Sequence, residues 1–117
     1  DLVLIEGAGG WRVPLSPRET LADLARELGV GVILVVGMRL GCINHALLTA
    51  EAVRRDGLTL AGWVANEPGE TMSCYLENLD TLRRLLPAPF LGEIPRLNPW
   101  NAEVAADSLS ISALCGM

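Results

Sequence analysis

An acidic residue followed by a cluster of glycines is the first stretch of this sequence that could do chemistry. Glu6 closes the apolar run from Leu2 to Ile5, and Gly7, Ala8, Gly9 and Gly10 follow it. Glycines let a phosphate or a metal approach the backbone closely, and carboxylate oxygen is a ligand that Mg²⁺ prefers beside nucleotide phosphates. The stretch favours a magnesium and nucleotide site; a strand that simply ends in a tight turn is the alternative.

The position of the Glu6 carboxylate depends on the apolar run that precedes it. The run is unbroken and too short for a helix, so residues 1–5 are predicted to form a strand that is buried on both faces. Such a strand would deliver Glu6 to the carboxyl end of the sheet, where open α/β sheets bind their ligands.

A polar pair follows a second apolar run. Residues 58–65 predict a strand that delivers Asn66 and Glu67 to the same edge as Glu6. An amide there can both donate to and accept from a purine edge. The alternative for Asn66 is a turn residue before Pro68.

Gly41, Cys42, Ile43 and Asn44 begin a predicted helix that runs to about Arg55. The free N–H groups of a helix start could bind a carboxylate or a phosphate, whereas an ordinary cap made by Asn44 is the alternative. His45 has no second histidine or acid at catalytic spacing, which favours a packed or interface residue. Cys42 has no partner histidine, so a nucleophilic role is not favoured.

Composition excludes several functions. The net charge of -5 argues against a nucleic-acid surface, and no apolar stretch approaches the roughly 18–20 residues of a membrane span. All basic residues are arginine, so the chain cannot contain the Gly-Lys-Ser/Thr of a Walker A loop. The 3 cysteines form no C-x-x-C pair, which excludes a zinc site of that kind and indicates reduced thiols in the cytoplasm.

The order of elements predicts an α/β fold. Helices are expected from Thr20 to Gly29 and from about Glu70 to Leu86, further strands over 30–36 and 90–95, and a loosely packed tail with a short helix over 98–117. Strand and helix alternate in this way in a parallel sheet with helices on both faces. Roughly four strands fall below the five or six of a complete doubly wound sheet, so we expect N-terminal strands to be missing.

Several blocks together closely resemble dethiobiotin synthetase. They are Val3 to Trp11 with Pro14-Leu15-Ser16, Val32 to Gly37 running into Leu40-Gly41-Cys42-Ile43-Asn44-His45-Ala46, Gly57 to Asn66, and Leu91 to Pro95. The likeness covers residues 1 to about 97 and corresponds to the carboxyl-terminal half of that family. It implies that residues 1–117 are the carboxyl-terminal part of a single P-loop NTPase-type α/β domain, a partial doubly wound sheet without the N-terminal strands and the Walker A loop.

The resemblance implies an ATP- and Mg²⁺-dependent cyclo-ligase of biotin synthesis. CO₂ adds to an amine of 7,8-diaminononanoate to give a carbamate, ATP phosphorylates the carbamate, and the second amine displaces phosphate to close a cyclic urea. The family's catalytic lysine and a magnesium-binding aspartate belong to the half that is absent here, so no catalytic residue is expected in this chain.

The resemblance also implies roles for individual residues. Glu6 would bind Mg²⁺, and the backbone of Gly7, Ala8 and Gly9 would lie along the phosphates. Asn66 and Glu67 would contact adenine, and Pro95, Arg96 and Leu97 would cover the base. In a homodimer, Leu40, Gly41, Cys42 and Asn44, with Tyr75 nearby, would hold the carboxylate of the diamine bound to the neighbouring subunit.

Two other classes remain open. A related P-loop synthase or partitioning ATPase would share the sheet and the strand-tip acid. A non-catalytic module that dimerises through residues 37–53 is the second alternative; the apolar stripe Ala46, Leu47, Ala50 and Val53 could form that contact, although a stripe that faces the core would look the same.

Overall fold

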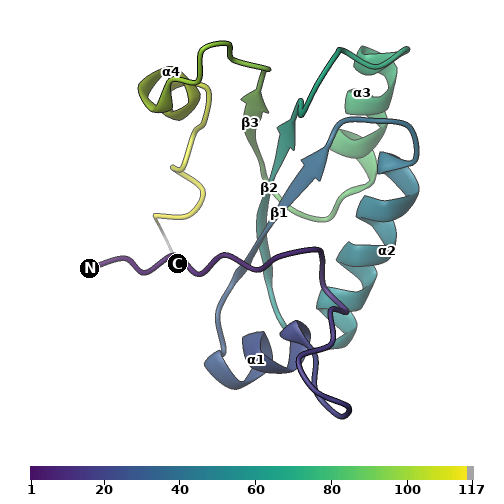
Figure 1. Cartoon of the computed structure of the whole chain (residues 1–117), viewed down its shortest axis with the longest axis vertical. Helices are drawn as coiled ribbons and strands as arrows, with labels where there is room; N and C mark the ends of the chain where they lie inside the picture. The colour runs from purple at the N-terminus through teal and green to yellow at the C-terminus, as the bar shows by residue number, and fades with distance from the viewer. Residues whose placement is uncertain (116–117) are drawn as a thin grey trace.

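Three parallel strands form the centre of the molecule. The structure, a computed structural model, describes residues 1–115, so the last two residues of the expected tail lie outside it. The sheet has the order β1-β2-β3, with β1 (Val32–Gly37), β2 (Leu60–Asn66) and β3 (Phe90–Ile94). The helices are α1 (Leu21–Leu28), α2 (Cys42–Arg55), α3 (Tyr75–Leu85) and α4 (Ala102–Asp107) (Figure 1). The predicted α/β class with a parallel sheet is confirmed.

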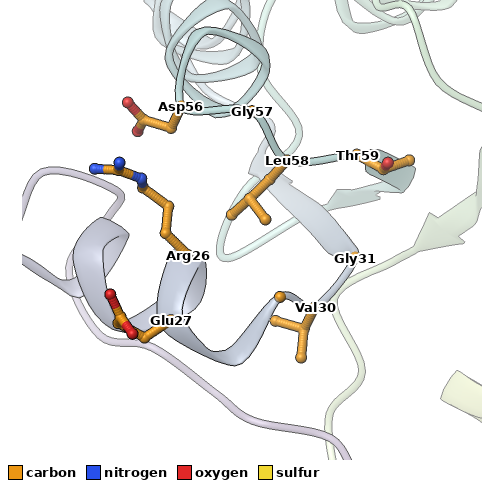
Figure 2. Close-up of a pocket in the computed structure, with 9 residues that line it drawn as sticks. Arg26, Glu27, Val30, Gly31, Asp56, Gly57, Leu58 and Thr59 are labelled. Carbon is orange, nitrogen blue, oxygen red and sulfur yellow. The ribbon is translucent and has the colours of Figure 1, made fainter.

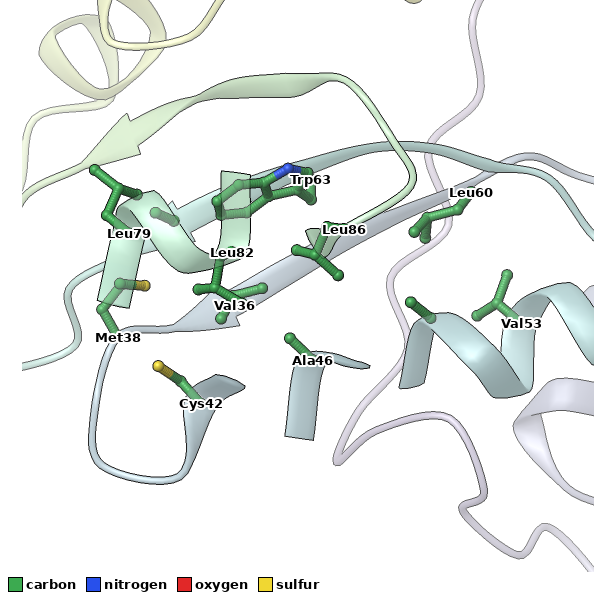
Figure 3. Packing of buried hydrophobic residues seen from close by; sticks show 12 residues of the cluster. Val36, Met38, Cys42, Ala46, Val53, Leu60, Trp63, Leu79, Leu82 and Leu86 are labelled. Carbon is green, nitrogen blue, oxygen red and sulfur yellow. The ribbon is translucent and has the colours of Figure 1, made fainter. Parts of the chain in front are cut away.

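The main core lies between the sheet and the pair α2 and α3. Trp63 from β2 and Leu82 from α3 are fully buried there, and Met38 from the turn after β1 is nearly so (Figure 3). The Trp63 ring lies 4.6 Å from that of Phe90, and the Arg83 guanidinium stands 4.7 Å from the Phe90 centroid. Burial of these large rings is the main attraction that holds α3 on the sheet.

The two faces of the sheet are covered unequally. β2 is central and buried along six of its seven residues. Ala105 of α4 is buried on the other side, and the tail binds there because the Ser110 N–H donates to the Leu91 carbonyl at 2.7 Å. β1 is an edge strand whose Val35 is 60% exposed, so the expectation that this strand is covered on both faces is wrong. Its Val32, Leu34 and Val36 pack against the core, and the alternate residues face outward because strand side chains alternate.

Residues 1–5 do not form the expected strand. They are extended, exposed and unpaired, with Leu2 82% exposed. In Figure 1 this segment (dark purple) runs across the molecule below the arrowheads that mark the carboxyl ends of the strands. An unbroken apolar run indicates burial on both faces only where a partner strand and covering layers are available. The described residues offer it neither.

The helix boundaries follow local signals closely. At the start of α1 the Thr20 N–H donates to Asp23 Oδ2 at 2.7 Å, and Gly29 ends the helix in the left-handed conformation. Leu24 and Leu28 of this helix are exposed. α3 begins at Tyr75 instead of about Glu70, because Cys74 has a φ of 56° that helical backbone does not adopt.

A side-chain cluster ties the loop after the glycines to the end of α2. Asp56 accepts hydrogen bonds from Trp11 Nε1 at 2.7 Å and from the Arg12 guanidinium at 2.8 and 3.0 Å. The Asp56 side chain is only 12% exposed. The Arg12 hydrogen bond lowers the pKa of this carboxyl, and the Trp11 hydrogen bond acts in the same direction. The three residues therefore connect parts of the chain that are 44 and 45 residues apart in sequence.

Asp56→Asn is expected to destabilise the protein by about 1–2 kcal/mol at neutral pH, because a charged acceptor of two donors becomes a neutral one. The folded-state pKa is lowered, so this contribution is present above the unfolded pKa of about 4 and is lost as the pH falls through the folded value. Thermal unfolding at several pH values tests this. The difference in unfolding free energy between wild type and Asp56→Asn should become smaller below about pH 4. The control is Asp80→Asn, since Asp80 pairs with Arg84 on the exposed face of α3; equal losses in both variants would contradict the prediction.

Candidate functional site

The carboxyl ends of the three strands meet at one edge, as predicted. The Met38 N–H, just after β1, donates to the Asn66 carbonyl at 2.8 Å, and the Glu67 N–H donates to the Ile94 carbonyl at 2.9 Å. Asn66 is therefore in register with Gly37 on one side and Ile94 on the other. The edge brings together most of the residues that the sequence singled out.

Asn66 is not a turn residue. It is the last residue of β2, and its φ is not positive, since Cys74 alone among the described non-glycine residues has that property. Its side chain makes no hydrogen bond within residues 1–115 and is partly exposed. The amide can therefore accept from and donate to a ligand at the strand tip. The alternative of a simple turn residue before Pro68 is wrong.

The start of α2 lies at the same edge. Gly41 is the N-cap residue, with a φ of 93° and no side-chain cap, so the alternative of an Asn44 cap is also wrong. The Ile43 and Asn44 N–H groups have no acceptor among the described residues, whereas the Cys42 N–H is already bonded to the Arg39 carbonyl at 3.0 Å. The helix start therefore offers two backbone donors and a partial positive charge to an anion.

The side chains around this helix start differ in what they can contact. Leu40 is 96% exposed and Asn44 is exposed. Cys42 is buried in the core with its Sγ 3.9 Å from Asn78 Oδ1. Only the backbone of Cys42 is therefore near a ligand at this edge, and the buried thiol agrees with the absence of a nucleophilic role.

Tyr75 lies at the start of α3, three residues before Asn78. It is partly buried against the core, and its hydroxyl donates to Glu93 Oε1 at 2.9 Å. Burial raises the pKa of Tyr75 above its ordinary range, and the hydrogen bond to Glu93 and the charges of Glu93 and Glu67 raise it further. The hydroxyl is therefore neutral at physiological pH.

Pro95, Arg96 and Leu97 follow β3 directly. Pro95 and Arg96 are exposed and Leu97 is partly buried. Because Ile94 accepts from the Glu67 N–H, this segment begins beside Glu67 and Asn66. Five of the residues expected around a nucleotide base therefore lie at the ends of two neighbouring strands: Asn66, Glu67, Pro95, Arg96 and Leu97.

Glu6, Gly7, Ala8 and Gly9 are not placed at this edge. Glu6 is exposed and belongs to the unpaired segment, so the expectation that a strand delivers it beside Asn66 is wrong for the described residues. Within residues 1–115, no group of three or more His, Cys, Asp or Glu side chains is placed to hold a metal. A single carboxylate still suits Mg²⁺ that is held mainly by substrate phosphates. Gly9 and Gly10 have φ values of 81° and 121°, which glycine favours.

The structure decides between alternatives for two features of α2. Ala46, Ala50 and Val53 are buried in the core and Leu47 packs against it, so the stripe faces the core and does not form the contact with a second subunit. His45 is exposed, so of the packed and interface alternatives the packed one is wrong.

Two open hollows in the described chain lie away from the strand tips. The one in Figure 2 lies between the end of α1 and the loop after α2, with Arg26, Val30, Asp56 and Leu58 among its lining residues. The other separates Trp11 and its neighbours from His45, Leu48 and Thr49 on the outer side of α2. Neither of these two hollows contains Asn66, Tyr75 or the helix-start donors. In the described residues no helix is long and apolar enough to cross a bilayer.

The fold and this edge agree with the comparison to known families. The chain belongs to the family described as AAA domain, whose model matches residues 1–104. Within that family it is similar to proteins named ATP-dependent dethiobiotin synthetase BioD. The relative from Cellvibrio japonicus is 57% identical and one from Pseudomonas aeruginosa is 59% identical, each over 114 residues that make up 97% of this chain and 50% of the relative. A relative from Aeromonas salmonicida is 55% identical over 115 residues.

These matches confirm the resemblance that the sequence blocks indicated. The chain spans about half the length of the curated relatives it matches.

Proposed function

We propose that this chain is part of an ATP-dependent dethiobiotin synthetase, a ligase that closes the cyclic urea of dethiobiotin from 7,8-diaminononanoate and CO₂. The observation that carries the proposal is the 57% identity to a relative of that name over 97% of the chain. The open strand edge supports it, since parallel α/β sheets bind their ligands there.

The nucleotide is assigned to the ends of β2 and β3. The Asn66 amide can pair with both a donor and an acceptor on the purine edge, with Glu67 beside it and residues 95–97 over the base. Glu6 would hold Mg²⁺ together with the phosphates, and the Gly7, Ala8 and Gly9 backbone would lie along them. Bound Mg²⁺ neutralises charge on the transferred phosphoryl group.

The far carboxylate of the diamine is assigned to the start of α2. The Ile43 and Asn44 N–H groups and the helix dipole favour an anion by about 0.3–1 kcal/mol when exposed, and by up to about 2 kcal/mol when partly buried. In the proposed homodimer, Leu40, Gly41, Cys42 and Asn44 of one subunit, with Tyr75 nearby, serve the diamine bound to the other subunit. A two-fold axis presents the same patch of each protomer to its partner.

The reaction needs groups that this chain does not contain. One amine of the diamine attacks CO₂, the carbamate oxygen takes the γ-phosphoryl group of ATP, and the second amine displaces phosphate to form the ring. Phosphoryl transfer depends on positively charged groups around the moving phosphoryl, and a P-loop supplies a lysine for this. The present sequence has no lysine.

The 117-residue chain alone is therefore expected to make no dethiobiotin, whereas a protein of the relatives' full length that carries this sequence should make it. Both expectations are tested by expressing each protein in a bacterial strain that lacks dethiobiotin synthetase. Growth is then measured on medium without biotin. Added dethiobiotin must restore growth in every culture as the control. Rescue by the 117-residue chain would contradict the first expectation, and failure of a well-expressed full-length protein would contradict the proposed function.

A further inference from the structure

One side-chain contact joins Tyr75, proposed to serve the diamine of the other subunit, to the strand end proposed to bind this subunit's own nucleotide. The Tyr75 hydroxyl donates to Glu93 Oε1 at 2.9 Å, across 18 residues of sequence. Tyr75 is the first residue of α3, and Glu93 is the last but one residue of β3. The hydrogen bond therefore ties the start of a helix to the end of a strand.

Glu93 also stands next to the nucleotide side of the edge. It is in register with Ala65 of β2, and the residue after it, Ile94, is in register with Asn66 and accepts from the Glu67 N–H. The chain then runs directly into Pro95. Glu93 and its bond to Tyr75 therefore lie one residue before the end of β3.

The polar contacts at the start of α3 fall into two sets. The Asn78 side-chain amide donates to the carbonyl of the N-cap residue Cys74 at 2.8 Å, and Cys42 Sγ lies 3.9 Å from Asn78 Oδ1. The Tyr75 ring itself is fixed by its packing against the core and by the bond to Glu93. A hydrogen bond to an ionised acceptor is roughly twice as strong as a neutral one, so loss of the carboxylate should let the Tyr75 ring turn.

We propose that Glu93 is a positioning residue, which holds Tyr75 toward the diamine bound to the other subunit and couples its orientation to the nucleotide end of β3 in its own subunit. This inference rests on the proposed function, in which Tyr75 lies by the diamine. The Tyr75 hydroxyl donates its proton to Glu93, so Glu93 would position the Tyr75 ring beside the diamine and not a hydrogen bond to the diamine carboxylate, which itself only accepts.

The test uses Glu93→Ala, Glu93→Gln, Tyr75→Phe and the Glu93→Ala/Tyr75→Phe double variant, each in the full-length protein. Glu93→Ala should raise the KM for the diamine about tenfold and leave kcat within about twofold, as expected for contacts that are equal in ground and transition states. Glu93→Gln should recover part of the loss, because an amide oxygen still accepts from the hydroxyl. The double variant should be no worse than the poorer single variant, since both remove the same contact.

Glu70→Gln is the matched control, because Glu70 is an exposed acid in the loop before α3 with no side-chain hydrogen bond to the described residues. An unchanged diamine KM in Glu93→Ala, or additive effects in the double variant, would overturn the positioning role while leaving the proposed function in place. Absence of turnover in the wild-type protein would overturn the proposed function, and the positioning role with it.

Discussion

Gly92→Ala is expected to destabilise the protein by about 3 kcal/mol or more, the largest effect of any single substitution considered for stability. Gly92 has a φ of 141°, which residues with a side chain rarely adopt. A Cβ at this position would collide with the backbone carbonyl oxygen of Ser108 and would lie 3.2 Å from the Leu109 Cα. Both atoms belong to backbone that cannot rotate away, so the tail must separate from β3.

Thermal unfolding of Gly92→Ala beside Gly37→Ala measures this effect. Gly37 ends β1, its φ is not positive, and an added Cβ would meet no atom within 4 Å. The control substitution should therefore change stability by less than about 1 kcal/mol. Similar melting temperatures for the two variants would show that the tail does not pack on Gly92 as described.

Glu6→Gln is expected to lower Mg²⁺-dependent turnover of the full-length protein by at least about 100-fold, because a neutral amide is a poor ligand for a hard cation beside phosphates. Stability should be almost unchanged, since Glu6 is exposed in the described structure. Steady-state assays over a range of Mg²⁺ concentrations, with thermal unfolding of the same samples, separate the two effects.

Glu51→Gln is the matched control for Glu6→Gln, because Glu51 is an exposed acid on α2 outside the proposed site. It should leave turnover unchanged. Turnover of Glu6→Gln near the wild-type value at saturating Mg²⁺ would show that Glu6 only ends an apolar run and binds no metal.

Local sequence signals were sufficient for most of the fold. The alternation of apolar runs with helical spacing located β2, β3 and α2, and Thr20 and Gly29 marked the ends of α1. Local sequence signals did not predict burial correctly where burial depends on residues that are distant in the sequence. Residues 1–5 have the composition of a buried strand but no neighbour to pair with, and β1 is apolar throughout although one of its faces is partly open.

The candidate site was predicted in part for the same reason. Parallel strands place their carboxyl ends together, so the position of Asn66 and Glu67 at this edge followed from the order of elements, whereas residues 95–97 were implied by the family resemblance. Glu93 was missed because nothing in its own segment marks it out, and its partner Tyr75 is 18 residues away. The contact of Asp56 with Trp11 and Arg12 could not be predicted either, since they lie 45 and 44 residues before it.

In the proposed function, this sequence belongs to an enzyme that builds the ureido carbon of dethiobiotin from CO₂. The direct measurement incubates the purified full-length protein with radiolabelled CO₂, 7,8-diaminononanoate, ATP and Mg²⁺, and separates the acid-stable products. We predict label in dethiobiotin, with one ADP and one phosphate released for each ring closed. ATP hydrolysis without label in dethiobiotin, under conditions in which the Cellvibrio japonicus relative is active, would contradict the account.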